Sequence, residues 1–343
     1  MRPTVALGLF LFLTGPTGIA DQTVSGDVWG TWFAGETITV IDDIRVPLGH
    51  SLIIEPGVMV LFTGRFKFTV EGLITAIGTA DKMITFTRAL PTEESKWRGF
   101  RFLRADDSSV LEYCHLEWAK GDGAYPDVRG GAVYIQGCSP TIRHCRFNDN
   151  YSHNEQFNGT GGAISMQEGC YSIVELNSMA RNQADLGGAI FVHWECDPTI
   201  RYNLMENNEA FFCGGAVEIG ANAKAMIYGN IVRDNKAVDF GGGLSLWSET
   251  IYYGTYAEVF NNVIVGNRVE GTGSYHDGGG IYCRYDTSRM SNNTIVGNYA
   301  TRGGGLYVVT FATFPPVVVN SIVRDNVASA GPGIFAEPTT GSR

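Results

Sequence analysis

Three residues of the 343-residue sequence could take part in acid–base chemistry at equivalent points of a repeated pattern. Glu218 follows the start of a Gly-Gly pair by four residues, and His193 and Arg284 follow such a pair by six. A glycoside hydrolase needs two carboxylates about 5–10 Å apart, and these positions supply only Glu218. A β-eliminating lyase needs a base beside an acidic sugar, usually with Ca²⁺ held by several carboxylates. The residues therefore favour binding over catalysis, with a polysaccharide lyase or hydrolase as the alternative.

Aromatic and amide side chains occupy the same positions and predict a sugar-binding face. Aromatic rings stack on the C–H faces of sugars, and amides hydrogen-bond the hydroxyl rims. The same residue types also favour strands in general, so an exposed strand without a ligand is the competing interpretation. The predicted ligand-binding residues, all expected to face solvent, are Arg101, Tyr134, Gln136, Gln167, Phe191, His193, Glu218, Trp247, Tyr282 and Arg284.

An internal repeat must position these side chains. One unit, Gly-Gly/Pro-Ala/Gly followed by an aliphatic residue, starts at residues 130, 161, 187, 214, 241, 278, 303 and 331. Between its copies runs Asn-x-apolar-x-x-Asn, as in NLMENN (203–208) and NIVRDN (230–235). The period is too short for a helix beside the strands, and apolar residues alternate after each glycine unit. A repeat of about 27 residues with this alternation is typical of one coil of a parallel β-helix, in which coils stack about 4.8 Å apart.

The glycines and asparagines then have structural roles at the corners of the coil. Glycine tolerates positive φ and close backbone approach without a Cβ penalty, and asparagine also tolerates the left-handed region. Asparagines stacked at one corner can hydrogen-bond from coil to coil as an amide ladder. The residues expected in this ladder are Asn182, Asn208, Asn235, Asn267 and Asn298.

With these units the chain resembles the right-handed parallel β-helix repeat family, which has the pectate-lyase-like fold. The GGA[ILV] units and the FNDN at 147–150 are also similar to repeats of polymorphic outer-membrane proteins. The resemblance covers roughly residues 50–335 and implies an all-β, single right-handed β-helix of about ten to eleven coils. It leaves function open, because this fold carries lyases, hydrolases, adhesins and scaffolds alike.

The two ends of the chain differ from the repeats. Residues 1–20 have a positive start, an apolar run and a small-residue site at Gly18-Ile19-Ala20, which predict a cleaved signal peptide and a secreted or cell-surface protein. Residues 21–47 are expected to cap the first coil, because an exposed edge invites pairing with other chains. The β-helix then runs over 48–343 and stops part-way through a coil, as a truncated C-terminal end would. No later segment is apolar for the roughly 18 residues that a membrane helix needs.

Composition limits the partners. The formal net charge is −10 and the charged fraction is 17%, which argues against nucleic acid. We expect a monomer that binds a polysaccharide or cell-surface glycan without a cofactor or metal, Ca²⁺ being needed only under the lyase alternative.

Seven cysteines are present, and three share a motif: CSPTI at 138, CYSIV at 170 and CDPTI at 196. Cys138, Cys170 and Cys196 should stack on successive coils, close enough for a disulfide. We predict a bridge from Cys170 to Cys138 or Cys196, and a column of buried thiols is the alternative. Cys114 and Cys145 align at a ladder position otherwise held by asparagine.

Two insertions, at 119–129 and 151–160, precede successive glycine units and should lie side by side. Their side chains Asp122, Asp127, His153 and Glu155 could converge on a site, or they could be solvated loop charges.

Overall fold

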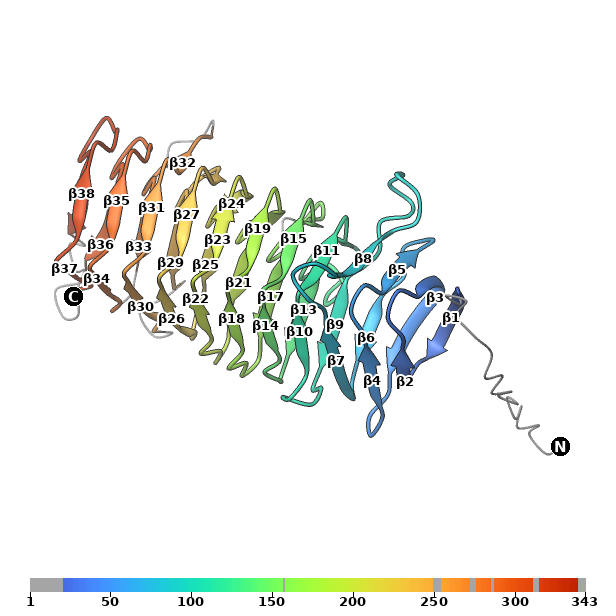
Figure 1. The fold of residues 1–343 in the computed structure, drawn as a ribbon. Helices are drawn as coiled ribbons and strands as arrows, with labels where there is room; N and C mark the ends of the chain where they lie inside the picture. The colour runs from blue at the N-terminus through green and yellow to red at the C-terminus, as the bar shows by residue number, and fades with distance from the viewer. Residues whose placement is uncertain are drawn as a thin grey trace.

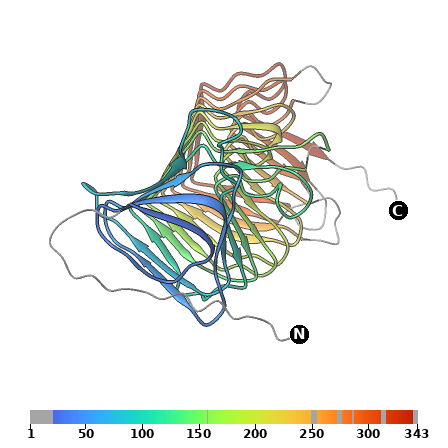
Figure 2. The ribbon, with the colours of Figure 1, turned by 90° about the vertical axis from the view of Figure 1, so that its right-hand side faces the viewer.

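The computed structural model describes residues 21–156, 158–248, 254–271, 276–284, 287–310 and 315–338. The described chain is all-β, and every strand pairing in it is parallel. The strands wind into one long solenoid, with coils stacked from the N-terminal to the C-terminal end (Figure 1). Seen from the N-terminal end, the coils lie one behind another and share one outline (Figure 2). The predicted signal peptide, residues 1–20, lies outside the described residues.

Each regular coil contributes one strand to each of three faces. The first face contains β6 (Phe68–Val70), β9 (Phe100–Leu103), β13 (Val133–Gln136), β17 (Ile164–Gln167), β21 (Ile190–Val192), β25 (Val217–Ile219), β29 (Leu244–Trp247), β33 (Ile281–Arg284), β36 (Leu306–Thr310) and β39 (Ile334–Pro338). The second face contains β5 (Met59–Phe62), β8 (Ile84–Arg88), β11 (Cys114–Glu117), β15 (Arg146–Asn148), β19 (Ser178–Ala180), β23 (Leu204–Glu206), β27 (Ile231–Arg233), β31 (Val263–Val265), β35 (Thr294–Val296) and β38 (Ile322–Arg324).

The third face is an 11-stranded sheet with one strand per coil, which agrees with the predicted ten to eleven coils. It contains β2 (Gly30–Trp32), β4 (Ser51–Ile54), β7 (Leu73–Ile77), β10 (Val110–Glu112), β14 (Thr141–Arg143), β18 (Ile173–Glu175), β22 (Thr199–Arg201), β26 (Lys224–Tyr228), β30 (Tyr256–Phe260), β34 (Arg289–Ser291) and β37 (Val317–Val319). A short 6-stranded sheet precedes the first face: β12 (Lys120–Gly121), β16 (Tyr151–Ser152), β20 (Gln183–Leu186), β24 (Glu209–Cys213), β28 (Lys236–Ala237) and β32 (Arg268–Val269).

Residues 21–47, expected as a cap, form strands that pair with the coils that follow. β1 (Gln22–Asp27) pairs with β3 (Thr37–Val46), and β2 pairs with β4. The long strand β3 pairs with β5 through its first half and with β6 through its second half, so it joins the second face to the first. That this segment also blocks association at the open end stays a prediction.

In the interior, the aliphatic side chains at each inward-facing position of the coil stack into a column. On the first face, Val133, Ile164, Ile190 and Val217 occupy paired positions, and all are fully buried. Because each coil buries its apolar side only against its neighbours, the register is fixed by the alternation that the sequence shows.

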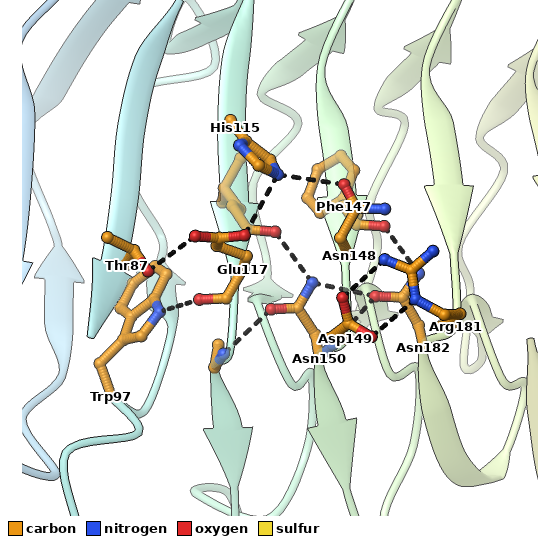
Figure 3. Close-up of polar contacts among 12 residues, drawn as sticks. Thr87, Trp97, His115, Glu117, Phe147, Asn148, Asp149, Asn150, Arg181 and Asn182 are labelled. Atoms are coloured by element: carbon orange, nitrogen blue, oxygen red, sulfur yellow. Dashed lines mark hydrogen bonds and ion pairs between the residues drawn. The ribbon is translucent and has the colours of Figure 1, made fainter. Parts of the chain in front are cut away.

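Two asparagine ladders close the corners on either side of the second face. In the predicted ladder, Nδ2 of Asn182 donates to Oδ1 of Asn208 at 2.9 Å, and Asn208 donates to Asn235 at 2.9 Å. Asn150 begins this ladder with a 2.9 Å bond to Asn182 (Figure 3). The ladder prediction is confirmed. The asparagines that share the position of Cys145 form a second ladder at the other corner: Asn177, Asn203, Asn230, Asn262 and Asn293.

Among the described residues no helix is long and apolar enough to cross a membrane.

Candidate functional site

The predicted ligand-binding residues form two columns on the first face, one four residues and one six residues after the start of each glycine pair. The first of these columns is buried. Its members share one register position on adjacent strands, as expected, but each is at most 4% exposed. The prediction that they face solvent is therefore wrong. The buried members are Arg101, Tyr134, Phe191, Glu218 and Tyr282.

The side chains of this first column are covered by the residue that precedes each glycine pair. Gly161 has a φ of 59°, and a Cβ on Gly162 would lie 2.6 Å from the backbone N of Gln183 on the next coil. The pair therefore makes a turn that only glycine fits, and the preceding residue folds back over the strand. Thr160 thus reaches Ser165, with 2.8 Å between their side-chain oxygens. The covering residues form their own ladder of bridges: Arg129, Thr160, Leu186, Cys213, Phe240, Asp277 and Arg302.

Glu218 illustrates the consequence for chemistry. Its side chain is 2% exposed, and Oε2 has no hydrogen-bond partner. Burial raises the pKa of Glu218 to about 8, although neighbouring Ser245 and Cys213 act in the opposite direction. The carboxyl group is therefore mostly neutral at pH 7, and it does not reach solvent. Its predicted role as a surface acid or base is not supported by this position.

The second column is more accessible. Gln136, His193, Trp247 and Arg284 are half-buried, whereas Gln167 is only 3% exposed. The imidazole of His193 lies over Gly220, where an added Cβ would be 2.5 Å from Cδ2 of the ring. Burial and the nearby charge of Arg129 lower the pKa of His193 to about 4, so the ring is neutral at pH 7.

One exposed aromatic residue beside this column was not predicted. Trp194 is 41% exposed, and its ring lies 5.3 Å from that of His193. Both Trp194 and Glu195 have positive φ, at 42° and 59°. Residues other than glycine and asparagine seldom adopt this conformation, so no sequence signal shows that the indole turns outward here. Further along the column, Trp247 packs beside Phe212, with ring centroids 5.8 Å apart.

A shallow concavity adjoins the N-terminal end of the same column. Its volume is about 480 Å³, and its lining consists of Leu48, Glu71, Leu103, Arg104 and Gln136. The amide of Gln136 donates to Glu168 at 2.7 Å.

The two insertions lie side by side, as predicted, because Nδ2 of Asn154 donates to the carbonyl of Gly123 at 3.2 Å. Their four candidate side chains do not converge. Asp122 and Asp127 turn toward basic residues before β6 and β9, whereas His153 pairs with Asp185 and Glu155 is exposed.

The His153–Asp185 pair was not foreseen. Nδ1 of His153 lies 2.6 Å from Oδ1 of Asp185, and Oδ2 of Asp185 accepts the backbone N–H of Gly159 at 2.8 Å. Asp185 is fully buried, while the His153 side chain is 27% exposed. The register of β16 and β20 predicts this contact, since the residues after Ser152 and Ala184 meet on adjacent coils. A buried carboxylate within hydrogen-bond distance of Nδ1 holds the imidazole ring in one orientation.

A different histidine belongs to a polar network on the second face. Nε2 of His115 lies 3.0 Å from Oδ1 of Asn148 and 3.6 Å from Oε2 of Glu117, and Thr87 donates to Glu117 at 2.9 Å (Figure 3). These contacts link three neighbouring coils across the sheet, and they match ordinary cross-strand pairing.

Cys138, Cys170 and Cys196 stack as the shared motif predicts, and the backbone N–H of Cys170 donates to the sulfur of Cys196 at 3.3 Å. All seven cysteines are buried free thiols in this structure. The predicted bridge is therefore absent here, and its formation in an oxidising compartment stays a prediction. Cys145 occupies the asparagine position, as expected, because its N–H donates to Oδ1 of Asn177 at 2.8 Å.

Within the described ranges no group of three or more His, Cys, Asp and Glu side chains is placed to hold a metal ion. The Ca²⁺ of the lyase alternative has no such group in this part of the chain.

Comparison with known proteins supports the architecture. Residues 101–253 match the family model described as the right handed beta helix region, and the parallel coils continue on both sides of that stretch. The fold of the chain is a right-handed parallel β-helix. A solved structure of a mutant periplasmic alginate epimerase has a similar fold, with a TM-score of 0.52 over 90% of this chain and 78% of that chain. The sequence identity to this β-helix is 12%, so the likeness concerns the fold alone. No curated protein sequence matches the chain significantly.

Proposed function

We propose that this β-helix is a secreted or cell-surface protein that binds a polysaccharide along the first face without catalysis. The observation that carries the proposal is the placement of Trp194 and Trp247 around His193. Val192, Ile219 and Leu246 are paired across β21, β25 and β29, so His193 and Trp247 lie two coils apart. The spacing is about 10 Å along the axis, roughly the length of two sugar units.

The side chains at this place suit a carbohydrate ligand. Trp194 offers an exposed indole beside the neutral ring of His193, which covers Gly220, and Trp247 lies one coil beyond Gly220. Indole faces stack on sugar C–H surfaces, while ring N–H groups and amides bond hydroxyls. The structurally similar protein is a periplasmic alginate epimerase, which supports a polysaccharide ligand and an extracytoplasmic location for this chain.

The experiment is retention on a panel of immobilised polysaccharides, read for both binding and new reducing ends. Trp194→Ala and Trp247→Ala should each weaken retention by about 1–3 kcal/mol, the range for an aromatic anchor. Trp29→Ala is the control, because Trp29 is an exposed indole, at 56%, that lies in the N-terminal coil away from this place. Equal retention of all three variants and the wild type would reject this face as the binding site.

One observation favours the second candidate, a polysaccharide lyase or hydrolase. The His153–Asp185 pair couples an imidazole to a buried carboxylate, a combination that general acid–base catalysis uses, and it lies in the insertion that adjoins loop 119–129. If the protein is an enzyme, His153→Gln should lower turnover by about 100-fold or more, because an amide transfers no proton. Glu155→Gln, an exposed change in the same insertion, should leave turnover intact. Wild-type protein that retains a polysaccharide but releases no product over days would exclude this candidate for that ligand.

A further inference from the structure

Four cationic side chains gather where loop 119–129 meets the strands β6 and β9. Asp122 contacts Arg65 and lies 3.6 Å from Nε of Arg98, and Asp127 lies 3.5 Å from Nζ of Lys67. The same Arg98 is 3.7 Å from Asp127 through a terminal nitrogen. Beneath them Arg101 donates to the backbone carbonyl of Asp127 at 3.0 Å. The cationic group therefore consists of Arg65, Lys67, Arg98 and Arg101 around two carboxylates.

Other acidic residues nearby do not balance the group. Glu93, which lies within electrostatic range of Arg65, is engaged by Lys96 at 2.7 Å and Lys120 at 3.5 Å. Asp43 accepts the backbone N–H of Lys67 rather than its ammonium group. Four cations therefore face two carboxylates at this place, in a chain whose formal net charge is −10.

The excess positive charge is poorly satisfied by the protein itself. Arg101 is 2% exposed, and its hydrogen bonds go only to the carbonyls of Phe100, Asp127 and Gly130. The buried Nε atom of Arg101 has no hydrogen-bond partner, and Nε of Arg98 has only Asp122 Oδ1 at 3.6 Å, which is beyond hydrogen-bond distance. Burial, and then the charge of Arg98, lower the pKa of Arg65, as expected where cations crowd. A cation held away from water is costly unless an anion compensates it.

The outer members of the group are accessible and adjoin the proposed glycan face. The side chains of Arg65, Lys67 and Arg98 are 43%, 31% and 30% exposed. Arg101 lies in the same column as Phe191, three strand spacings away through β13 and β17, or about 14 Å. Trp247 lies two strand spacings further on, so its axial separation from Arg101 is about 24 Å. A chain of about five sugar units could therefore contact both Trp247 and the cationic group.

We propose that Arg65, Lys67 and Arg98 bind an acidic group of the glycan, a carboxylate or a sulfate. The planar guanidinium groups of Arg65 and Arg98 match either oxyanion with paired N–H donors. This inference rests on the proposed function, and it assigns the ligand to the acidic polysaccharides despite the overall negative charge of the protein.

The experiment compares polymers that share a backbone and differ in charge. Affinity is measured for polygalacturonate and its methyl-esterified form, and for dextran sulfate and dextran, each at 50 and 300 mM NaCl. We expect wild-type protein to bind one charged polymer at least tenfold more tightly than its neutral partner, with affinity that falls as salt rises. The carboxylate and sulfate arms identify which oxyanion is recognised.

Variants locate the effect. The double variant Arg65→Gln with Arg98→Gln should lose about tenfold or more for the charged polymer and keep its affinity for the neutral one. Arg233→Gln is the control, an arginine 47% exposed on the second face beside Glu206. Arg98→Lys, which keeps the charge, should lose less, and melting curves should verify that each variant is folded.

Equal affinity for charged and neutral polymers, or an unchanged affinity of the double variant, overturns this inference. The proposed function still stands in that case if Trp194→Ala weakens binding. Failure to retain any of the four polymers overturns this inference, and the wider panel then decides the proposed function.

Discussion

The side-chain oxygens of Thr160 and Ser165 lie 2.8 Å apart, joined across the turn that begins with the Gly161–Gly162 pair. Both residues are buried, although Ser165 points away from the aliphatic interior. The contact shows that the repeated glycine pair makes a fold-back turn, so that each coil buries a second, outer layer. The layer changes chemistry from coil to coil, from the Thr160–Ser165 bond to the stacked rings of Phe240 and Tyr282, whose centroids are 4.6 Å apart.

The outer layer gives Glu218 a measurable effect on stability. Its folded pKa of about 8 lies above its ordinary value of 4.5, so the folded state holds more protons than the unfolded state between these pH values. Stability from this residue is therefore complete below pH 4.5 and is lost as pH rises toward and through 8, by on the order of 4 kcal/mol. Glu218→Gln should remove that loss. Urea unfolding at pH 5 and pH 8 checks it, with exposed Glu155→Gln as the control, and parallel pH profiles for Glu218→Gln and wild type would contradict it.

Asn208 should be among the most sensitive ladder positions. It accepts bonds from the N–H and Nδ2 of Asn182, and it donates to Met179 O and to Asn235. Asn208→Leu leaves these buried groups unpaired, at about 1–3 kcal/mol each, so the free energy of unfolding should fall by at least about 3 kcal/mol. Asn158→Ala, in an exposed loop, should change it by less than about 0.5 kcal/mol. A loss of under 1 kcal/mol for Asn208→Leu would show that the ladder contributes little.

The cysteine column should oxidise in an oxidising compartment. A hydrogen bond with Cys196 lowers the pKa of Cys170, which favours Cys170 as the attacking thiolate. We predict a disulfide from Cys170 to Cys196 or to Cys138, with the third cysteine left as a free thiol. Non-reducing peptide mapping after oxidative expression checks the pairing, and Cys170→Ser should leave both others alkylatable. Full alkylation of all three wild-type cysteines would mean that the column remains a set of buried thiols.

Processing of the N-terminus is also testable. The apolar run and the Gly18-Ile19-Ala20 site predict that secreted material begins near Asp21. N-terminal sequencing of protein recovered from the medium or periplasm decides it, and a chain that still starts at Met1 there would contradict the prediction.

Much of the architecture follows from sequence because local pattern and pairing are coupled in a solenoid. The alternation at Ile164 and Met166, and the spacing of Asn182 and Asn208, were enough to align coils. The burial of Tyr134 and Glu218 was not predictable from alternation, which shows the face a side chain takes and not what covers it. Trp194 was missed for a different reason, since its positive φ breaks the alternation at the end of a strand.

The His153–Asp185 contact could be predicted from the sequence only in part. It follows from the register of β16 and β20 once the coils are aligned, although a separation of 32 positions hides it in the sequence. Asp185 also accepts the backbone N–H of Gly159, so it contacts the insertion 151–160 near both of its ends.

The most direct test of glycan binding at the first face is the set of indole N–H resonances. The chain has six tryptophans, and each signal can be assigned by a Trp→Phe variant. The proposal predicts that a retained polysaccharide shifts the signals of Trp194 and Trp247, while those of buried Trp97 and of Trp29 in the N-terminal coil stay in place. Saturating ligand that leaves Trp194 and Trp247 unmoved, or shifts Trp29 alone, would contradict the account.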